Sequence, residues 1–172
     1  MSARISRMTH RVEVDQSIKI EQSGATILAF ANGITHAILI PSEAKTTAYR
    51  VLRRRGKASA TAYPLLFAAC LFLLLRDHLK QLDQVIIDIE YEGKNADIRS
   101  FLLEHIWKAE PTFAPDQIIF RRIGKHSPAH VKANAVREQR DKHYRKVSTE
   151  ELVQLVELKE AGGSLFNVGI CC

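Results

Sequence analysis

The sequence predicts an α/β fold: a mixed five-stranded sheet, in which a three-strand antiparallel meander is joined by two further strands, with helices on both faces. Apolar and polar residues alternate from Val12 to Ile20, which is typical of a strand. Asn32-Gly33 separates the next two runs of β-type residues and is a strong hairpin signal. Later strand-like runs alternate with helical patterns, which favours strands reached through helical connections.

The expected elements follow from local patterns and from turn residues. Gly24 begins the turn after the first strand, and the meander ends before Pro41-Ser42-Glu43, a helix start. Ser127-Pro128 opens a later helix, because proline suits the first helical position. We expect strands at residues 11–21, 25–31, 35–40, 84–91 and 117–123, and helices at 42–56, 60–82, 95–110, 128–145 and 148–162. This gives an N-terminal arm (1–10), one domain (11–146) and a C-terminal helix with a tail (147–172).

Composition narrows the class of protein. Hydrophobic residues make up 46% of the chain, and the net charge is +6 with a pI near 9.4. This excess of positive charge favours an anionic partner, nucleic acid before a membrane. The longest apolar stretch, residues 63–75, is shorter than the roughly 20 residues of a membrane span, so we expect a buried helix and no membrane partner. Cysteine spacing indicates neither disulfides nor structural zinc, which suits a reducing cytoplasm.

Two acids stand among apolar strand residues and are the main candidate site. Asp15 follows Val14, and Asp88 lies between Ile87 and Ile89. An unpaired buried carboxylate is too costly to keep, so each acid needs a partner or an exposed strand end. Carboxylates on adjacent strands can hold Mg²⁺ or Mn²⁺ for phosphodiester chemistry. Glu90 shares the parity of Asp88 and would face the same side.

The element order, with Asp15 in the first strand and Asp88 in the fourth, resembles the ribonuclease H-like superfamily over residues 11–145. The resemblance implies that these two acids bridge divalent ions and that a further acid or histidine lies near the helix after the fifth strand. His126 and His130 fall at that place. Ribonucleases H also carry a glutamate in the helix after the third strand. The long helix here has no acid before Asp77, so Glu43 or Glu90 would have to supply that ligand.

Two basic clusters favour phosphate contacts. One ends the first helix, and the other runs from residue 121 to 146 with nine Lys and Arg against two acids. The side chains that we expect to hold a phosphate backbone are Arg53, Arg54, Arg55, Lys125 and Lys132. The sequence therefore predicts a metal-dependent nuclease, with two alternatives left open. One is a catalytically inactive nucleic-acid- or protein-binding module on the same fold, and the other is a scaffold that forms homodimers through its tail helix and Leu165-Phe166.

Overall fold

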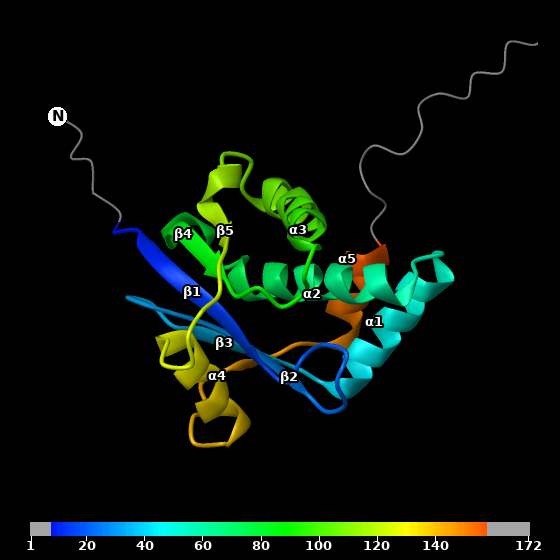
Figure 1. The fold of residues 1–172 in the computed structure, drawn as a ribbon, viewed down its shortest axis with the longest axis horizontal. Coiled ribbons are helices and arrows are strands. Elements are labelled where there is room, and N and C mark those ends of the chain that lie inside the picture. Colours follow the sequence, from blue (N-terminus) through cyan, green and yellow to red (C-terminus); the bar gives the residue numbers. More distant parts are fainter. Residues whose placement is uncertain (1–7, 158–172) are drawn as a thin grey trace, which may run out of the picture.

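The computed structural model describes residues 8–157 and confirms the predicted α/β class. Its mixed sheet has the strand order β5-β4-β1-β2-β3-β6 (Figure 1). Strands β1, β2 and β3 form the antiparallel meander, and β4, β5 and β6 join it through parallel pairings. The strands are β1 (His10–Ser17), β2 (Thr26–Ala31), β3 (His36–Ile40), β4 (Leu82–Ile87), β5 (Ile118–Phe120) and β6 (Arg145–Lys146).

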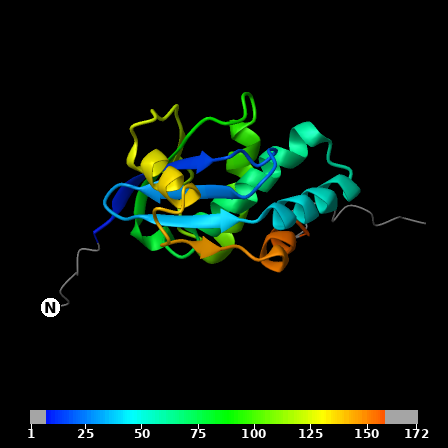
Figure 2. The same ribbon diagram turned by 90° about the horizontal axis from the view of Figure 1, so that it is seen from below.

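Helices cover both faces of the sheet, as predicted. The helix α4 lies alone on one face, whereas α2, α3, α1 and α5 lie on the other (Figure 1). Figure 2 looks onto the α4 face, where this helix passes in front of the strands. The helices are α1 (Ser42–Arg54), α2 (Ser59–Leu75), α3 (Asn95–Ala109), α4 (Pro128–Arg137) and α5 (Thr149–Glu157), with 3₁₀ turns η1 (Leu79–Gln81) and η2 (Pro115–Gln117).

The large core centres on α2, which is apolar on every side. Thirteen of its seventeen residues are buried, because it packs against the sheet and against α1, α3 and α5. This confirms the prediction of a helix enclosed in the protein core. Among residues 8–157, no helix combines the length and the apolar character that crossing a bilayer requires.

Several predicted boundaries were wrong. The helix expected to reach Arg145 ends at Arg137, because Gln139 takes a left-handed backbone conformation (φ 60°) and the chain then turns into β6, the sixth strand. The helix expected to reach Leu82 ends at Leu75. The fourth strand covers Leu82–Ile87 and so stops just before Asp88.

The parallel pairing of β1 and β4 places the candidate acids together. Val14 pairs with Ile87, and the amide of Asp88 donates to the carbonyl of Val14 at 3.2 Å. Asp15 and Asp88 therefore leave the same edge of the sheet from neighbouring strands. The predicted tail helix is present as α5 and packs against α1, while its predicted end at Gly162-Gly163 lies outside the described residues. Leu165-Phe166 also lies outside them.

Candidate metal centre

Three carboxylates meet at the carboxyl ends of β1 and β4. Asp15, Asp88 and Glu90 each offer one oxygen atom, and these atoms all lie within 4.8 Å of one another. Asp15 is buried, and the other two residues are half-buried. We call these three residues the carboxylate group. The sequence predicted all of them.

Asp15 is held from both sides. Its Oδ1 accepts a hydrogen bond from the amide of Gln16 at 2.8 Å, and its Oδ2 lies 2.6 Å from Nδ1 of His130 on α4. The other ring nitrogen of His130, Nε2, lies 2.8 Å from the amide nitrogen of Asn134. Because an amide nitrogen can only donate, Nε2 accepts and the ring proton sits on Nδ1, facing Asp15. His130 therefore contacts the carboxylate group through Asp15.

Local sequence explains why His130 reaches the sheet. The side chain of Ser127 caps α4 and accepts a hydrogen bond from the amide of His130 at 3.1 Å. The small buried residues Ala129 and Ala133 then let the helix approach the strands closely. His130 and Asn134 are one helical turn apart and share a face.

Asp88 lies just beyond the end of β4 and is fixed by the loop after β5. Its Oδ1 accepts a hydrogen bond from the amide of Ile123 at 2.8 Å. Burial raises the pKa of Asp88 above its ordinary value, and the neighbouring charge of Asp15 adds to this, while the Ile123 amide opposes it. Ionisation of Asp88 in this site therefore costs more free energy than ionisation of an exposed aspartate.

Glu90 completes the group from the segment after Asp88. Burial raises its pKa, and the charges of Asp88 and Asp15 act in the same direction, against the opposing effects of Gln16 and Lys19. Lys19 Nζ lies 3.7 Å from Glu90 Oε2, but its side chain is 47% exposed, so this ion pair is well solvated. The three acids therefore face the exposed Lys19, the charge of Arg122 and the ring of His130.

The donor set fits a hard divalent cation. All three residues supply carboxylate oxygen atoms, the ligands that Mg²⁺ and Mn²⁺ prefer. Two ligands on opposite sides of one Mg²⁺ stand about 4.2 Å apart, since each bond is about 2.1 Å long. A group spanning 4.8 Å therefore needs an adjustment of less than about 1 Å to close on an ion. Burial, and after it the charges of the neighbouring acids, raise the pKa values of Asp88 and Glu90, and a bound cation would favour their ionised forms.

The other predicted site residues lie outside this group. Glu43 is exposed in the first turn of α1, and His126 is exposed in the turn before α4. Lys125 is also exposed in that turn, in the loop whose Ile123 amide holds Asp88.

Three of the predicted phosphate-binding residues, Arg53, Arg55 and Lys132, have partners within the chain. Lys132 Nζ donates to Asp141 at 2.5 Å and to the carbonyl of His143 at 3.0 Å, so it stabilises the connection from α4 to β6. At the end of α1 away from the sheet (Figure 1), Arg53 donates to Ser59, and Arg55 donates to the carbonyl of Val156 on α5. Arg54 is exposed there.

Sequence reasoning missed four contributors to the site: Gln16, Lys19, Ile123 and Asn134. The spacing of His130 and Asn134 was a usable signal, because residues four apart on a helix share a face. The Ile123 amide gave no signal, since any residue except proline supplies it.

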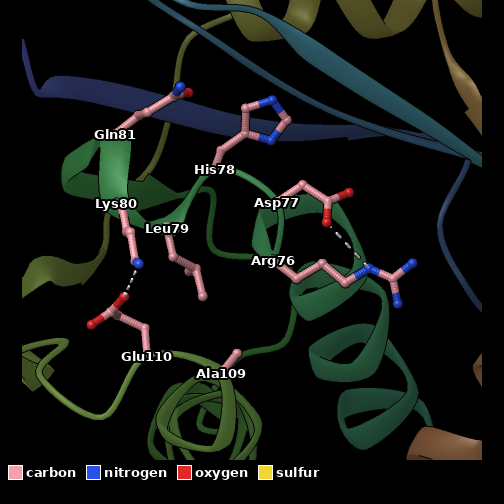
Figure 3. Close-up of a pocket in the computed structure, with 8 residues that line it drawn as sticks. All are labelled: Arg76, Asp77, His78, Leu79, Lys80, Gln81, Ala109 and Glu110. Atoms are coloured by element: carbon pink, nitrogen blue, oxygen red, sulfur yellow. Dashed lines mark ion pairs between the residues drawn. The ribbon is translucent and has the colours of Figure 1, made fainter.

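Another hollow, of about 320 Å³, lies at the opposite edge of the sheet (Figure 3). Its charged side chains pair with one another, Arg76 with Asp77 and Lys80 with Glu110 (Figure 3). Gln81, which lines the hollow, precedes β4, whereas Asp88 follows that strand. The length of β4, about 20 Å, therefore separates the hollow from Asp88. This hollow is therefore not part of the metal centre.

Comparison with known proteins adds no relative: no protein-family model, no curated protein and no solved structure matches the chain. The sheet order with its antiparallel meander is consistent with ribonuclease H-like topology.

Proposed function

We propose that this protein is a ribonuclease H-like nuclease that hydrolyses nucleic-acid phosphodiesters with Mg²⁺ or Mn²⁺. One observation carries the proposal: Asp15, Asp88 and Glu90 bring their oxygen atoms within 4.8 Å at the adjoining ends of two parallel strands. When bound there, the metal would supply Lewis-acid stabilisation and an activated water.

The chain's own residues have separate roles in this proposal. The three carboxylates hold the cation, and the Ile123 amide fixes the orientation of Asp88. His130 holds a proton at Nδ1 beside Asp15 and is 29% exposed, so it is placed to exchange protons with solvent or substrate. The exposed Lys125 and the half-exposed Arg121 would orient the phosphate from the neighbouring loop.

An inactive binding module on the same fold is the second candidate. Ribonucleases H place a glutamate in the helix after the third strand. Here α1 carries only the exposed Glu43, which lies outside the carboxylate group, and α2 carries no acid. In the proposed enzyme Glu90 takes that place, entering from the segment after β4.

The test compares two aspartates under identical conditions. Purified protein is incubated with single-stranded, duplex and hybrid substrates in Mn²⁺, and the cleavage rate of wild type is compared with that of Asp15→Asn. We expect a loss of at least about 100-fold, typical when a group that stabilises transition-state charge is removed. Asp83→Asn is the matched control, because Asp83 is exposed at the other end of β4.

Metal binding is measured separately from activity. Mn²⁺ should raise the melting temperature of wild type and of Asp83→Asn, but not that of Asp15→Asn. Stabilisation by Mn²⁺ without cleavage of any substrate would favour the inactive module. Equal rates of cleavage by wild type and Asp15→Asn would remove the carboxylate group from catalysis.

A further inference from the structure

A groove of about 550 Å³ lies on the α4 face of the sheet, between the end of that helix and the strands. Its floor includes Ile27 and Leu39 of the sheet and Val136 of α4, and its rim includes Lys142 and Tyr144. The volume is within the range of small-molecule sites, and the combination of an apolar floor with a few polar groups is typical of them. None of the residues that line the groove belongs to the carboxylate group, so the metal centre does not explain the groove.

The groove and the carboxylate group share one face of the sheet. Asp15 pairs with Ala29, and the next pair on that face, Ser17 with Ile27, reaches the groove. The helix α4 connects the same two places, with His130 at Asp15 and Val136 at the groove. Six helical residues span about 9 Å. A nucleic-acid strand rises about 3.4 Å per nucleotide, so this separation corresponds to two or three nucleotides.

Two strained residues line the groove. Ile18 and Gln139 both have left-handed backbone conformations, with φ of 63° and 60°. A β-branched residue such as isoleucine rarely adopts this conformation, because its side chain clashes with the backbone. Such strain persists where the surrounding structure holds it, and it is frequent at ligand sites. Ile18 and Gln139 therefore keep backbone conformations that their local sequence disfavours, so the surrounding structure must stabilise them.

The charge at the rim suits an anion. Of the charged residues that line the groove, Arg137 and Lys142 are basic and Asp141 is acidic. Asp141 already accepts hydrogen bonds from Lys132 and from the amide of His143. Glu138 contacts Arg137 and Arg140. Lys142 makes no ion pair with any residue in the described part of the chain.

We propose that this groove binds an unpaired nucleobase two or three nucleotides from the phosphate at the carboxylate group, an inference that rests on the proposed action on nucleic acid. The apolar floor takes the flat face of the base, and Tyr144, which is 40% exposed, stacks on it. Lys142 contacts the adjoining phosphate. The protein therefore prefers substrates with unpaired nucleotides over continuous duplex.

Binding is measured by fluorescence anisotropy with Ca²⁺ in place of Mg²⁺, so that cleavage does not intervene. The probes are a labelled DNA duplex and the same duplex with a short bulge of unpaired thymidines. Tyr144→Ala should weaken binding of the bulged probe about ten-fold and leave the paired probe within about two-fold. Tyr144→Phe keeps the ring and should bind both probes as wild type does.

A second variant fills the groove. Ala25 lines it, and Ala25→Phe should abolish the preference for the bulged probe. Ala60→Phe is the matched control, because Ala60 is exposed in the first turn of α2, outside the groove. Melting temperatures of the variants establish that they are folded, and the exposed position of Tyr144 keeps the test valid if Ala25→Phe is unstable.

The outcomes separate this proposal from the proposed function. Loss of the preference in Tyr144→Ala and Ala25→Phe, with paired-probe binding retained, supports the groove as the base site. If the wild type shows no preference for the bulged probe, or if the variants keep that preference, the groove is not a base site. The proposed metal-dependent cleavage is tested separately, by Asp15→Asn. A change of oligomeric state in Ala25→Phe without any change in DNA binding would instead make the groove an interface between copies, and would also overturn the proposal.

Discussion

Two acidic neighbourhoods of this protein are built in opposite ways. Around Glu151 of α5, Arg145 donates at 2.6 Å, Arg76 at 3.2 Å and the Ser148 amide at 2.9 Å. Burial alone would raise the pKa of Glu151, but the Ser148 hydrogen bond and the two arginines hold it below its ordinary value. In the carboxylate group, burial and mutual repulsion raise the pKa of Asp88 and Glu90.

The difference separates a structural acid from candidate metal ligands. Glu151 joins α5 to the end of α2 and to β6, and both of its arginine partners favour its ionised form. The carboxylate group keeps its acids together at the end of two strands, where the charges of Lys19 beside Glu90 and of Arg122 on Asp88 offset their burial and repulsion only in part. Acids arranged in this way destabilise the protein by repulsion until a cation neutralises them.

The largest expected effect comes from breaking the structural acid. Glu151→Ala leaves Arg76 and Arg145 without their carboxylate and should lower the free energy of unfolding by about 2–3 kcal/mol. Chemical denaturation measures this loss. The cleavage rate per folded molecule should stay at the wild-type level, and a parallel fall in that rate would show that the two neighbourhoods are coupled.

The second effect concerns the support of His130. Asn134→Ala removes the donor that fixes the histidine ring proton on Nδ1. Groups that orient metal-site residues in this way typically contribute 10- to 100-fold, and we expect about ten-fold weaker Mn²⁺ binding or cleavage. Val131→Ala is the control, because Val131 is 56% exposed on the same helix. A changed melting temperature with unchanged Mn²⁺ affinity would mean that Asn134 is only structural.

The sequence predicted the strands and the acids of the site because both leave local signals. Asp15 and Asp88 stand out among valines and isoleucines, and Ser127-Pro128 marks the start of the helix that carries His130. The two-residue strand β6 left no signal, since periodicity needs a longer run. The contact between His130 and Asp15 spans 115 positions and depends on tertiary packing, which no local pattern encodes.

The third prediction is that removing a charged group stabilises the metal-free protein, whereas removing a paired charge usually destabilises it. In metal-free protein at neutral pH, Asp88→Asn removes one repelling charge and keeps an oxygen to accept the Ile123 amide. We expect the melting temperature to rise by about 2–4 °C, the shift that about 1 kcal/mol produces in a chain of this size. With Mn²⁺ the order should reverse, because only the wild type gains the stabilisation of the ion. A variant less stable than wild type in metal chelator would contradict the repulsion argument.

The smallest effect is a difference in pH dependence between the two neighbourhoods. A carboxyl group whose pKa is higher in the folded than in the unfolded chain binds more protons when folded. For Asp88 the free energy of unfolding therefore rises as the pH falls through the window between its ordinary and its raised pKa, and the advantage of metal-free Asp88→Asn over wild type should shrink there. Glu151 has the reverse sign, because its folded pKa is lowered.

The stabilisation that Glu151 contributes is present above its ordinary pKa and is lost as the pH falls below that value. The deficit of Glu151→Gln should therefore shrink as the pH falls from the ordinary pKa of glutamate to the lowered pKa of Glu151. The Asp88→Asn advantage should instead shrink as the pH falls from the raised pKa of Asp88 to the ordinary pKa of aspartate. Thermal melts of the three proteins in chelator, from neutral to acidic pH, measure both curves. An Asp88→Asn advantage that does not shrink on acidification would mean that Asp88 does not carry the repulsion, and the distinction between the two neighbourhoods would then rest on geometry alone.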